Sequence, residues 1–126
     1  MNILIIEDDH EVAEVLDISI TTGLSDSVVD VASDGVIAFG KCCKKKYDLI
    51  LTDYKMPNIN GTKAAKYIIT SNNSLNKETP FIILSAYVPE LEEKANFDFA
   101  SHVLTKPCKS SELIEVIKKY LPNTAA

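Results

Sequence analysis

Five short apolar runs are spaced along the chain. They are Ile3–Ile6, Val28–Val31, Leu49–Leu51, Phe81–Leu84 and Val103–Leu104. Each run is too short for a helix and is rich in Ile, Val and Leu. Apolar residues at consecutive positions are typical of strands that are buried on both faces. The pattern therefore predicts five strands of a sheet that is covered on both sides.

Helical spacing appears between these runs. Val12, Val15, Leu16 and Ser19 follow the i, i+3, i+4, i+7 spacing of one helix face, and Gly23 is placed to cap the end of that helix. The polar stretch Ser71–Thr79 is predicted to be a loop. Four further helices are predicted at Val36–Cys43 after Asp34-Gly35, at Thr62–Thr70, at Pro89–Phe97, and behind Ser110 as N-cap, with Leu113, Ile117, Tyr120 and Leu121 as its apolar stripe.

Strands that alternate with helices indicate βαβ units, a parallel sheet and right-handed crossovers that cover both of its faces. A chain of 126 residues with 46% hydrophobic and 25% charged residues has the size and composition of one α/β domain. We expect this domain to occupy residues 1–121, and residues 122–126 to be a tail or the start of a linker. The chain contains neither a secretory signal nor an apolar stretch of about 18 residues, so we expect a cytoplasmic protein that does not span a membrane.

Charge is distributed unevenly along the chain, whose formal net charge is −5. The first 40 residues hold nine acidic residues and no Lys, which suggests either a cation site or a solvated acidic surface. Arg is absent, so direct nucleic-acid binding by this domain is not expected. The lysines at positions 41, 44, 45 and 46 have two interpretations. They can complement the dipole at the end of the second predicted helix, or they can form a docking patch for an acidic partner.

Polar side chains follow four of the predicted strands. The segments are Glu7-Asp8-Asp9, Thr52-Asp53, Ser85-Ala86 and Thr105-Lys106-Pro107. Because ligands bind at the carboxyl ends of the strands in such sheets, these segments are expected to converge on one cleft. Several carboxylates in one cleft need a cation beside them, and the three cysteines show no metal-ligand spacing. Oxygen ligands of this kind select Mg²⁺.

These groups suit phosphoryl transfer onto an Asp. A carboxylate beside Mg²⁺ can attack a phosphoryl group, while a Lys neutralises the charge on that group and a Ser hydroxyl donates a hydrogen bond to one of its oxygens. Asp8 or Asp9 can alternatively cap the helix that follows them.

The order of the motifs IIEDD, LILTDYKMPNING, FIILSA and LTKP resembles the receiver domain of two-component response regulators, and it covers nearly the whole chain. DYKMPNING, which matches the pattern D-x-x-M-P-x-x-x-G of that family, is the most specific piece. The resemblance implies an α/β fold with a doubly wound five-stranded parallel sheet, (βα)5, in the flavodoxin-like order 2-1-3-4-5.

The resemblance also implies the roles of the metal-site residues. Asp53 would be the phosphoacceptor. Glu7 and Asp8 would form the acidic pair that holds Mg²⁺, together with Asp53 and the backbone carbonyl of Lys55.

Two further residues would carry the switch, Ser85 as its hydroxyl and Lys106 as the ion-pairing lysine. The chain departs from the family at Val103 and Cys108, where the family usually has aromatic residues. Phosphorylation is expected to be intact, whereas propagation of the signal is expected to differ.

The implied function is a phosphorylation-dependent signalling switch that does not turn over a separate substrate. Its phosphodonor would be a phosphohistidine of a sensor histidine kinase or of a histidine phosphotransfer protein. Its output would be a downstream protein, a fused output domain or a dimer formed on phosphorylation. The alternative is a phosphate-independent interaction module of the same fold. A Mg²⁺-dependent phosphatase is disfavoured because Lys55 stands where such an enzyme needs a second Asp.

Overall fold

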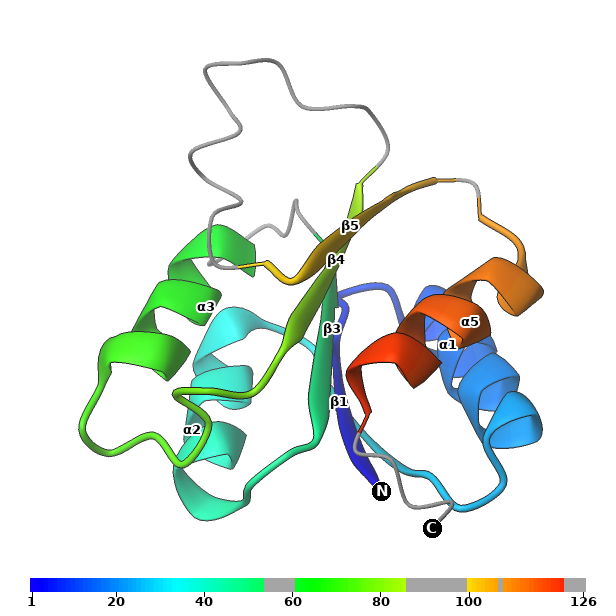
Figure 1. The fold of residues 1–126 in the computed structure, drawn as a ribbon. Helices are drawn as coiled ribbons and strands as arrows, with labels where there is room; N and C mark the ends of the chain where they lie inside the picture. The colour runs from blue at the N-terminus through cyan, green and yellow to red at the C-terminus, as the bar shows by residue number, and fades with distance from the viewer. Residues whose placement is uncertain (54–60, 86–99, 107, 122–126) are drawn as a thin grey trace, which may run out of the picture.

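The computed structural model describes residues 1–53, 61–85, 100–106 and 108–121. Strands and helices alternate along this part of the chain, except that residues outside the described part separate the fourth strand from the fifth (Figure 1). The elements in chain order are β1 (Asn2–Ile6), α1 (His10–Gly23), β2 (Val28–Ala32), α2 (Gly35–Lys44), β3 (Leu49–Asp53), α3 (Gly61–Thr70), β4 (Phe81–Ser85), β5 (His102–Thr105) and α5 (Ser110–Tyr120). The five predicted strands and four of the predicted helices are confirmed. The remaining predicted helix, Pro89–Phe97, lies outside the described residues.

The strands pair in parallel as one sheet in the order β2-β1-β3-β4-β5. This order confirms the one that the resemblance implied. β1 is an interior strand between β2 and β3, with Ile6 at its end opposite both Ala32 of β2 and Thr52 of β3. Among the described helices, none combines the length and apolarity that a bilayer crossing needs.

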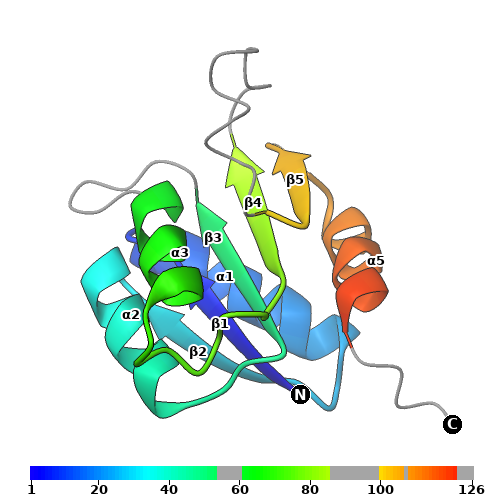
Figure 2. The same cartoon turned by 60° about the vertical axis from the view of Figure 1, so that its left-hand side comes forward.

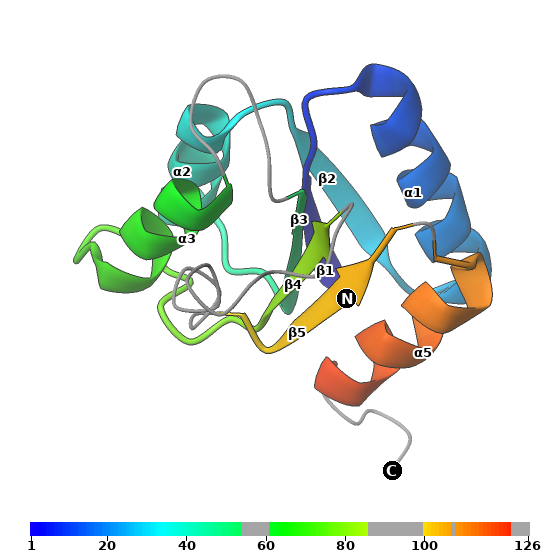
Figure 3. The same cartoon turned by 90° about the horizontal axis from the view of Figure 1, so that it is seen from above.

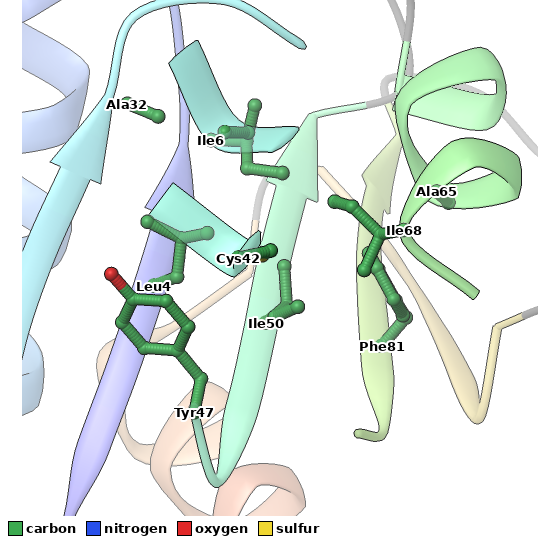
Figure 4. Close-up of a cluster of buried hydrophobic side chains, with 10 residues drawn as sticks. Leu4, Ile6, Ala32, Cys42, Tyr47, Ile50, Ala65, Ile68 and Phe81 are labelled. Atoms are coloured by element: carbon green, nitrogen blue, oxygen red, sulfur yellow. The ribbon is translucent and has the colours of Figure 1, made fainter. Parts of the chain in front are cut away.

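Helices cover both faces of the sheet. Helices α2 and α3 lie on one face, and α1 and α5 lie on the other (Figures 1 and 3). Along β1, Leu4 and Ile6 point into the core under α2 and α3, whereas Ile3 and Ile5 point into the core under α1 and α5. Figure 4 shows the first of these cores. Since consecutive strand residues are buried on opposite faces, the continuous apolar runs follow directly from the two helical layers.

The buried side of α1 differs from the predicted one. Ala13 and Ile20 are buried and Leu16 packs against the same core, whereas Val12 and Val15 are exposed, Val15 to 63%. Both sets of apolar residues, Val12 with Val15 and Ala13 with Ile20, recur at helical spacing, so the sequence pattern fits either side of the helix. The direction in which the chain leaves β1 decides which of them faces the sheet.

Two predicted caps are also wrong. Gly23 is the last residue of α1 and Leu24 is its C-cap. A Cβ at Gly23 would lie 2.8 Å from Ile114 Cγ1 of α5, so glycine allows close approach of the two helices there. Lys109, not Ser110, is the N-cap of α5. The hydroxyl of Ser110 instead lies 3.1 Å from that of Ser19 on α1, as a hydrogen bond between the two helices.

The loop 71–80 is confirmed as a loop, but it holds a buried polar network that its composition did not predict. The side-chain amide of Asn76 is fully buried and donates to the carbonyls of Cys42 and Lys45, at 2.9 and 2.8 Å. Its carbonyl oxygen accepts from the backbone N–H of Tyr47 at 2.7 Å and from the hydroxyl of Thr79 at 2.8 Å. Asn76 thus satisfies backbone groups at the end of α2, which would otherwise lose their hydrogen bonds on burial.

Two glycines in helices provide a matched pair of substitutions. Gly40 in α2 has open space where a Cβ would stand, so Gly40→Ala is expected to raise the free energy of unfolding by ~0.5–1 kcal/mol through backbone entropy. Gly23→Ala is expected to lower it by ~1 kcal/mol, because Ile114 has to move. Urea unfolding of both variants tests the pair. Equal shifts of the same sign would contradict the close packing of α1 on α5.

Candidate functional site at the carboxyl edge of the sheet

The ends of four strands meet at one edge of the sheet. Glu7 follows β1, Asp53 ends β3, Ser85 ends β4 and Lys106 follows β5. Figure 2 shows the arrowheads of β3, β4 and β5 at the same edge. For Asp53 and Ser85, the described part is the strand backbone.

The pairing register fixes the order of these residues across the edge. Asp53 lies opposite Leu84, one residue before Ser85, and Ser85 lies opposite Thr105, one residue before Lys106. The fold thus brings together backbone positions that are distant in sequence. Lys55 and Pro107 lie outside the described residues.

Glu7 is a buried carboxylate at this edge, with 4% of its surface exposed. Its backbone N–H donates to the carbonyl of Ala32 at 3.0 Å, which extends the pairing of β1 with β2 by one residue. Its Oε1 accepts from the backbone N–H of Asp9 at 3.2 Å. The bond to Ala32 therefore fixes the Glu7 backbone, and the bond from Asp9 orients its carboxylate.

Asp9 caps α1, which settles the alternative that the sequence left open. Its Oδ1 accepts from the N–H groups of Glu11 and Val12, at 2.9 and 3.2 Å. Asp8 is exposed and lies between this cap and Glu7. An acid directly before a predicted helix was the signal in the sequence for this cap. Nothing in the sequence indicated the hydrogen bond from the Asp9 amide to Glu7.

The two departures from the family lie beside β5. Val103 is half-buried in β5, opposite Ile83. Cys108 is half-buried and packs against the core under α1 and α5. Burial raises the pKa of the Cys108 thiol, so it is neutral at pH 7 and serves as a packing group.

The donor chemistry of the edge fits a hard divalent cation. Glu7 and Asp8 contribute carboxylate oxygens, and the buried position of Glu7 favours a positive partner for its charge. Within the described residues, no group of three His, Cys, Asp or Glu side chains forms a metal cluster. The side chain of Asp53 is not among the described side chains, so this absence does not extend to it.

Comparisons with known proteins agree with this arrangement. Residues 3–118 match the family described as the response regulator receiver domain. The chain is 31% identical over 121 residues to the response regulator ArlR of Staphylococcus epidermidis, and 32% identical over 120 residues to ArlR of Staphylococcus saprophyticus. These alignments cover 95% and 94% of this chain but 52% and 51% of the relatives. The chain thus spans about half the length of these curated relatives.

Two solved structures show the same fold. The chemotaxis protein CheY4 of Vibrio cholerae has a TM-score of 0.84 at 23% identity, with 95% of this chain and 98% of that chain covered. The response regulator TrrA of Thermotoga maritima, in complex with Mg²⁺-BeF, has a TM-score of 0.80 at 27% identity, with 95% and 98% covered. In sequence and in fold alike, this chain belongs to the family of response regulator receiver domains.

Proposed function

We propose that this domain is a phosphorylation switch with Asp53 as phosphoacceptor. The observation that carries the proposal is the register that puts Glu7, Asp53, Ser85 and Lys106 at the ends of paired strands. In the forward step, a carboxylate oxygen of Asp53 attacks phosphorus, the bond to the donor imidazole breaks, and an aspartyl phosphate forms. Water later cleaves this acyl phosphate and restores the carboxylate.

The metal in this proposal is Mg²⁺, held by Glu7, Asp8, Asp53 and the backbone carbonyl of Lys55. When bound, it would offset the negative charge of the phosphoryl oxygens. The Mg²⁺-BeF complex of the relative TrrA supports this assignment. The contribution of the chain itself is a Glu7 carboxylate that the amide of Asp9 orients before any ion arrives.

Ser85 and Lys106 read out the phosphoryl group in this proposal. The hydroxyl of Ser85 donates to one phosphoryl oxygen, and the ammonium of Lys106 pairs with another. Both residues stand at strand ends, so their approach to the phosphate draws β4 and β5 toward β3. The aspartyl phosphate thereby shifts the population between two conformations of the domain.

The phosphodonor is a phosphohistidine of a sensor histidine kinase or a phosphotransfer protein, and we assign its docking to α1. Val15 and Ile18 are apolar but exposed, and they follow an acidic first turn that begins beside Glu7. Ile18 also lines a groove of about 560 Å³ between α1 and α5. An exposed apolar strip on the helix that begins at the carboxyl edge suits a partner that must bring its phosphohistidine to Asp53.

The output belongs to a downstream protein, to a fused domain or to a dimer that forms on phosphorylation. We assign residues 1–121 to the receiver domain and place the protein in the cytoplasm. The domain turns over no substrate other than its own aspartyl phosphate.

The phosphoacceptor is tested with a small-molecule phosphodonor and Mg²⁺. One phosphoryl group per chain is expected by mass spectrometry, and Asp53→Asn is expected to abolish it because the nucleophilic oxygen is lost. Asp26→Asn, at an exposed acid after α1, serves as the control and is expected to label as the parent does. Labelling of Asp53→Asn, or unchanged labelling in excess chelator, would refute the proposal.

The Asp9 cap is tested by a pair of variants that lose the same charge. Asp9→Asn keeps a capping oxygen, whereas Asp9→Ala loses it, so only Asp9→Ala is expected to lower the free energy of unfolding by ~1 kcal/mol. Asp9→Ala is also expected to weaken Mg²⁺ binding severalfold more than Asp9→Asn, because Glu7 loses its ordered amide donor. Urea unfolding and calorimetric Mg²⁺ titration measure the two effects. Equal Mg²⁺ affinities in the two variants would show that the cap does not position Glu7.

The α1 docking surface is tested by Val15→Glu. Its side chain is 63% exposed, so the fold should be retained, whereas a partner would have to bury the new charge. Phosphotransfer from the histidine protein that labels the parent is expected to slow by about tenfold, equivalent to ~1.4 kcal/mol. Labelling by a small phosphodonor should not change. Val28→Glu, an exposed position on the edge strand β2, should leave both rates unchanged. Slowing in both variants would argue against α1 as the specific surface.

A further inference from the structure

The two helical layers of the domain carry different charge. Helices α2 and α3, as described, hold four lysines and no Asp or Glu. Helix α1, on the opposite face of the sheet, holds three acids and no Lys (Figure 3). The layer formed by α2 and α3 is therefore basic, although the net charge of the chain is negative. The lysines of this layer are Lys41, Lys44, Lys63 and Lys66.

Apolar side chains are exposed on the same two helices. Val36 and Ile37 of α2 are exposed to 61% and 42%, and Tyr67 of α3 to 57%. The rings of Phe39 and Tyr67 meet edge-on with centroids 6.3 Å apart, so α2 and α3 are joined by an aromatic contact. Val36, Ile37, Tyr67 and the four lysines together are called the α2–α3 face below.

Gly40 adds a second feature to this face. It lies in the middle of α2, its outer side is exposed, and a Cβ there would meet nothing within 4 Å. Unlike Gly23, it has no neighbour among the described residues that requires glycine. A bare helix backbone on an exposed face permits another backbone to approach closely.

The carboxylates of Asp30 and Asp34, near this face, already accept hydrogen bonds from other groups of the chain. Asp30 accepts from Lys45 at 3.0 Å and from the hydroxyl of Tyr47 at 2.8 Å. Burial alone would raise the pKa of Asp30, but these hydrogen bonds lower it below its ordinary value. Asp34 accepts from the N–H of Ile37 as the N-cap of α2. The charge of Lys41 also helps to lower the pKa of Asp30, whereas no ion pair or hydrogen bond within the described part of the chain joins either carboxylate to Lys44 or Lys66.

Compensation of helix dipoles explains only part of the charge. Lys41 and Lys44 lie in the last turn of α2, where cations are favourable. Lys66 does not lie in the last turn of α3, and the dipole gives no reason for exposed Val36 or Tyr67. A docking role accounts for the lysines, the apolar residues and Gly40 together.

We propose that the α2–α3 face docks an acidic amphipathic helix of a partner protein. Its apolar stripe would cover Val36, Ile37 and Tyr67, with its backbone passing over Gly40, and its Asp and Glu residues would face the lysines. A helix of about four turns is ~22 Å long, which exceeds the ~15 Å of the ten residues of α2 and lets its end cross onto α3. The absence of Arg favours an acidic protein over a nucleic acid. This surface is on the opposite face from α1, so the proposal does not depend on the phosphorelay chemistry.

The probe is a synthetic helical peptide of about four turns, with Leu on one stripe and Glu elsewhere. It is titrated into the ¹⁵N-labelled full chain, and amide shifts are followed by NMR. Shifts are expected in α2 and α3, and they should weaken as salt is added. A matched peptide with Lys in place of every Glu should cause none.

Variants locate the site. Lys41→Glu combined with Lys66→Glu is expected to weaken binding of the Glu peptide at least tenfold. The control, Lys118→Glu combined with Lys119→Glu on α5, should bind as the parent does. Gly40→Gln should retain the fold, because a Cβ at Gly40 meets no atom of the described residues within 4 Å, but it should also weaken binding.

Four results would overturn the proposal. They are shifts confined to α1 or α5, equal binding of the Lys peptide, insensitivity to the Lys41/Lys66 pair, and no shift at millimolar peptide. Stronger binding to anionic phospholipid vesicles than to the Glu peptide, lost in the same Lys variant, would assign the face to a membrane instead. Self-association lost in that variant would assign it to a second copy.

Discussion

Parallel pairing of β1 with both β2 and β3 is the constraint on which the rest of this structure depends. A parallel strand in the middle of a sheet cannot be followed by a tight turn, so each connection must cross over through a helix. The crossovers cover both faces, and this coverage makes consecutive apolar residues such as Ile3 to Ile6 stable in the interior. The same pairing aligns strand ends, so Glu7 and Asp53 are neighbours across the sheet edge although 46 positions separate them.

The two ends of the strands carry different kinds of polar groups. The carboxyl edge gathers several carboxylates and a lysine at the strand ends, and a cation beside the carboxylates would lower their mutual repulsion. At the opposite edge, hydrogen bonds of the buried Asn76 side chain join the end of α2 to the residues before β3. The Asn76 network thus lies at the end of the sheet opposite to the proposed phosphorylation site.

The two helical layers also differ in what they offer to other molecules. The α1 side has acidic residues and exposed apolar residues. The α2–α3 side is basic and carries its own exposed apolar residues. A domain of this size can thus present two chemically distinct surfaces, because the sheet between them separates the layers completely (Figure 1).

The sequence by itself determined the strands, the alternation with helices and the residues that stand at the strand ends, because burial on both faces leaves an unbroken apolar run. The motif order at those ends was specific enough to identify the family. Only the tertiary structure decided which stripe of α1 is buried, because Val12 and Val15 satisfy the helical period as well as Ala13 and Ile20 do. It also decided that Gly23 serves contact with Ile114, and that Asn76 is a buried anchor in a polar loop. These roles depend on contacts with residues far away in the chain, and local composition contains no information about them.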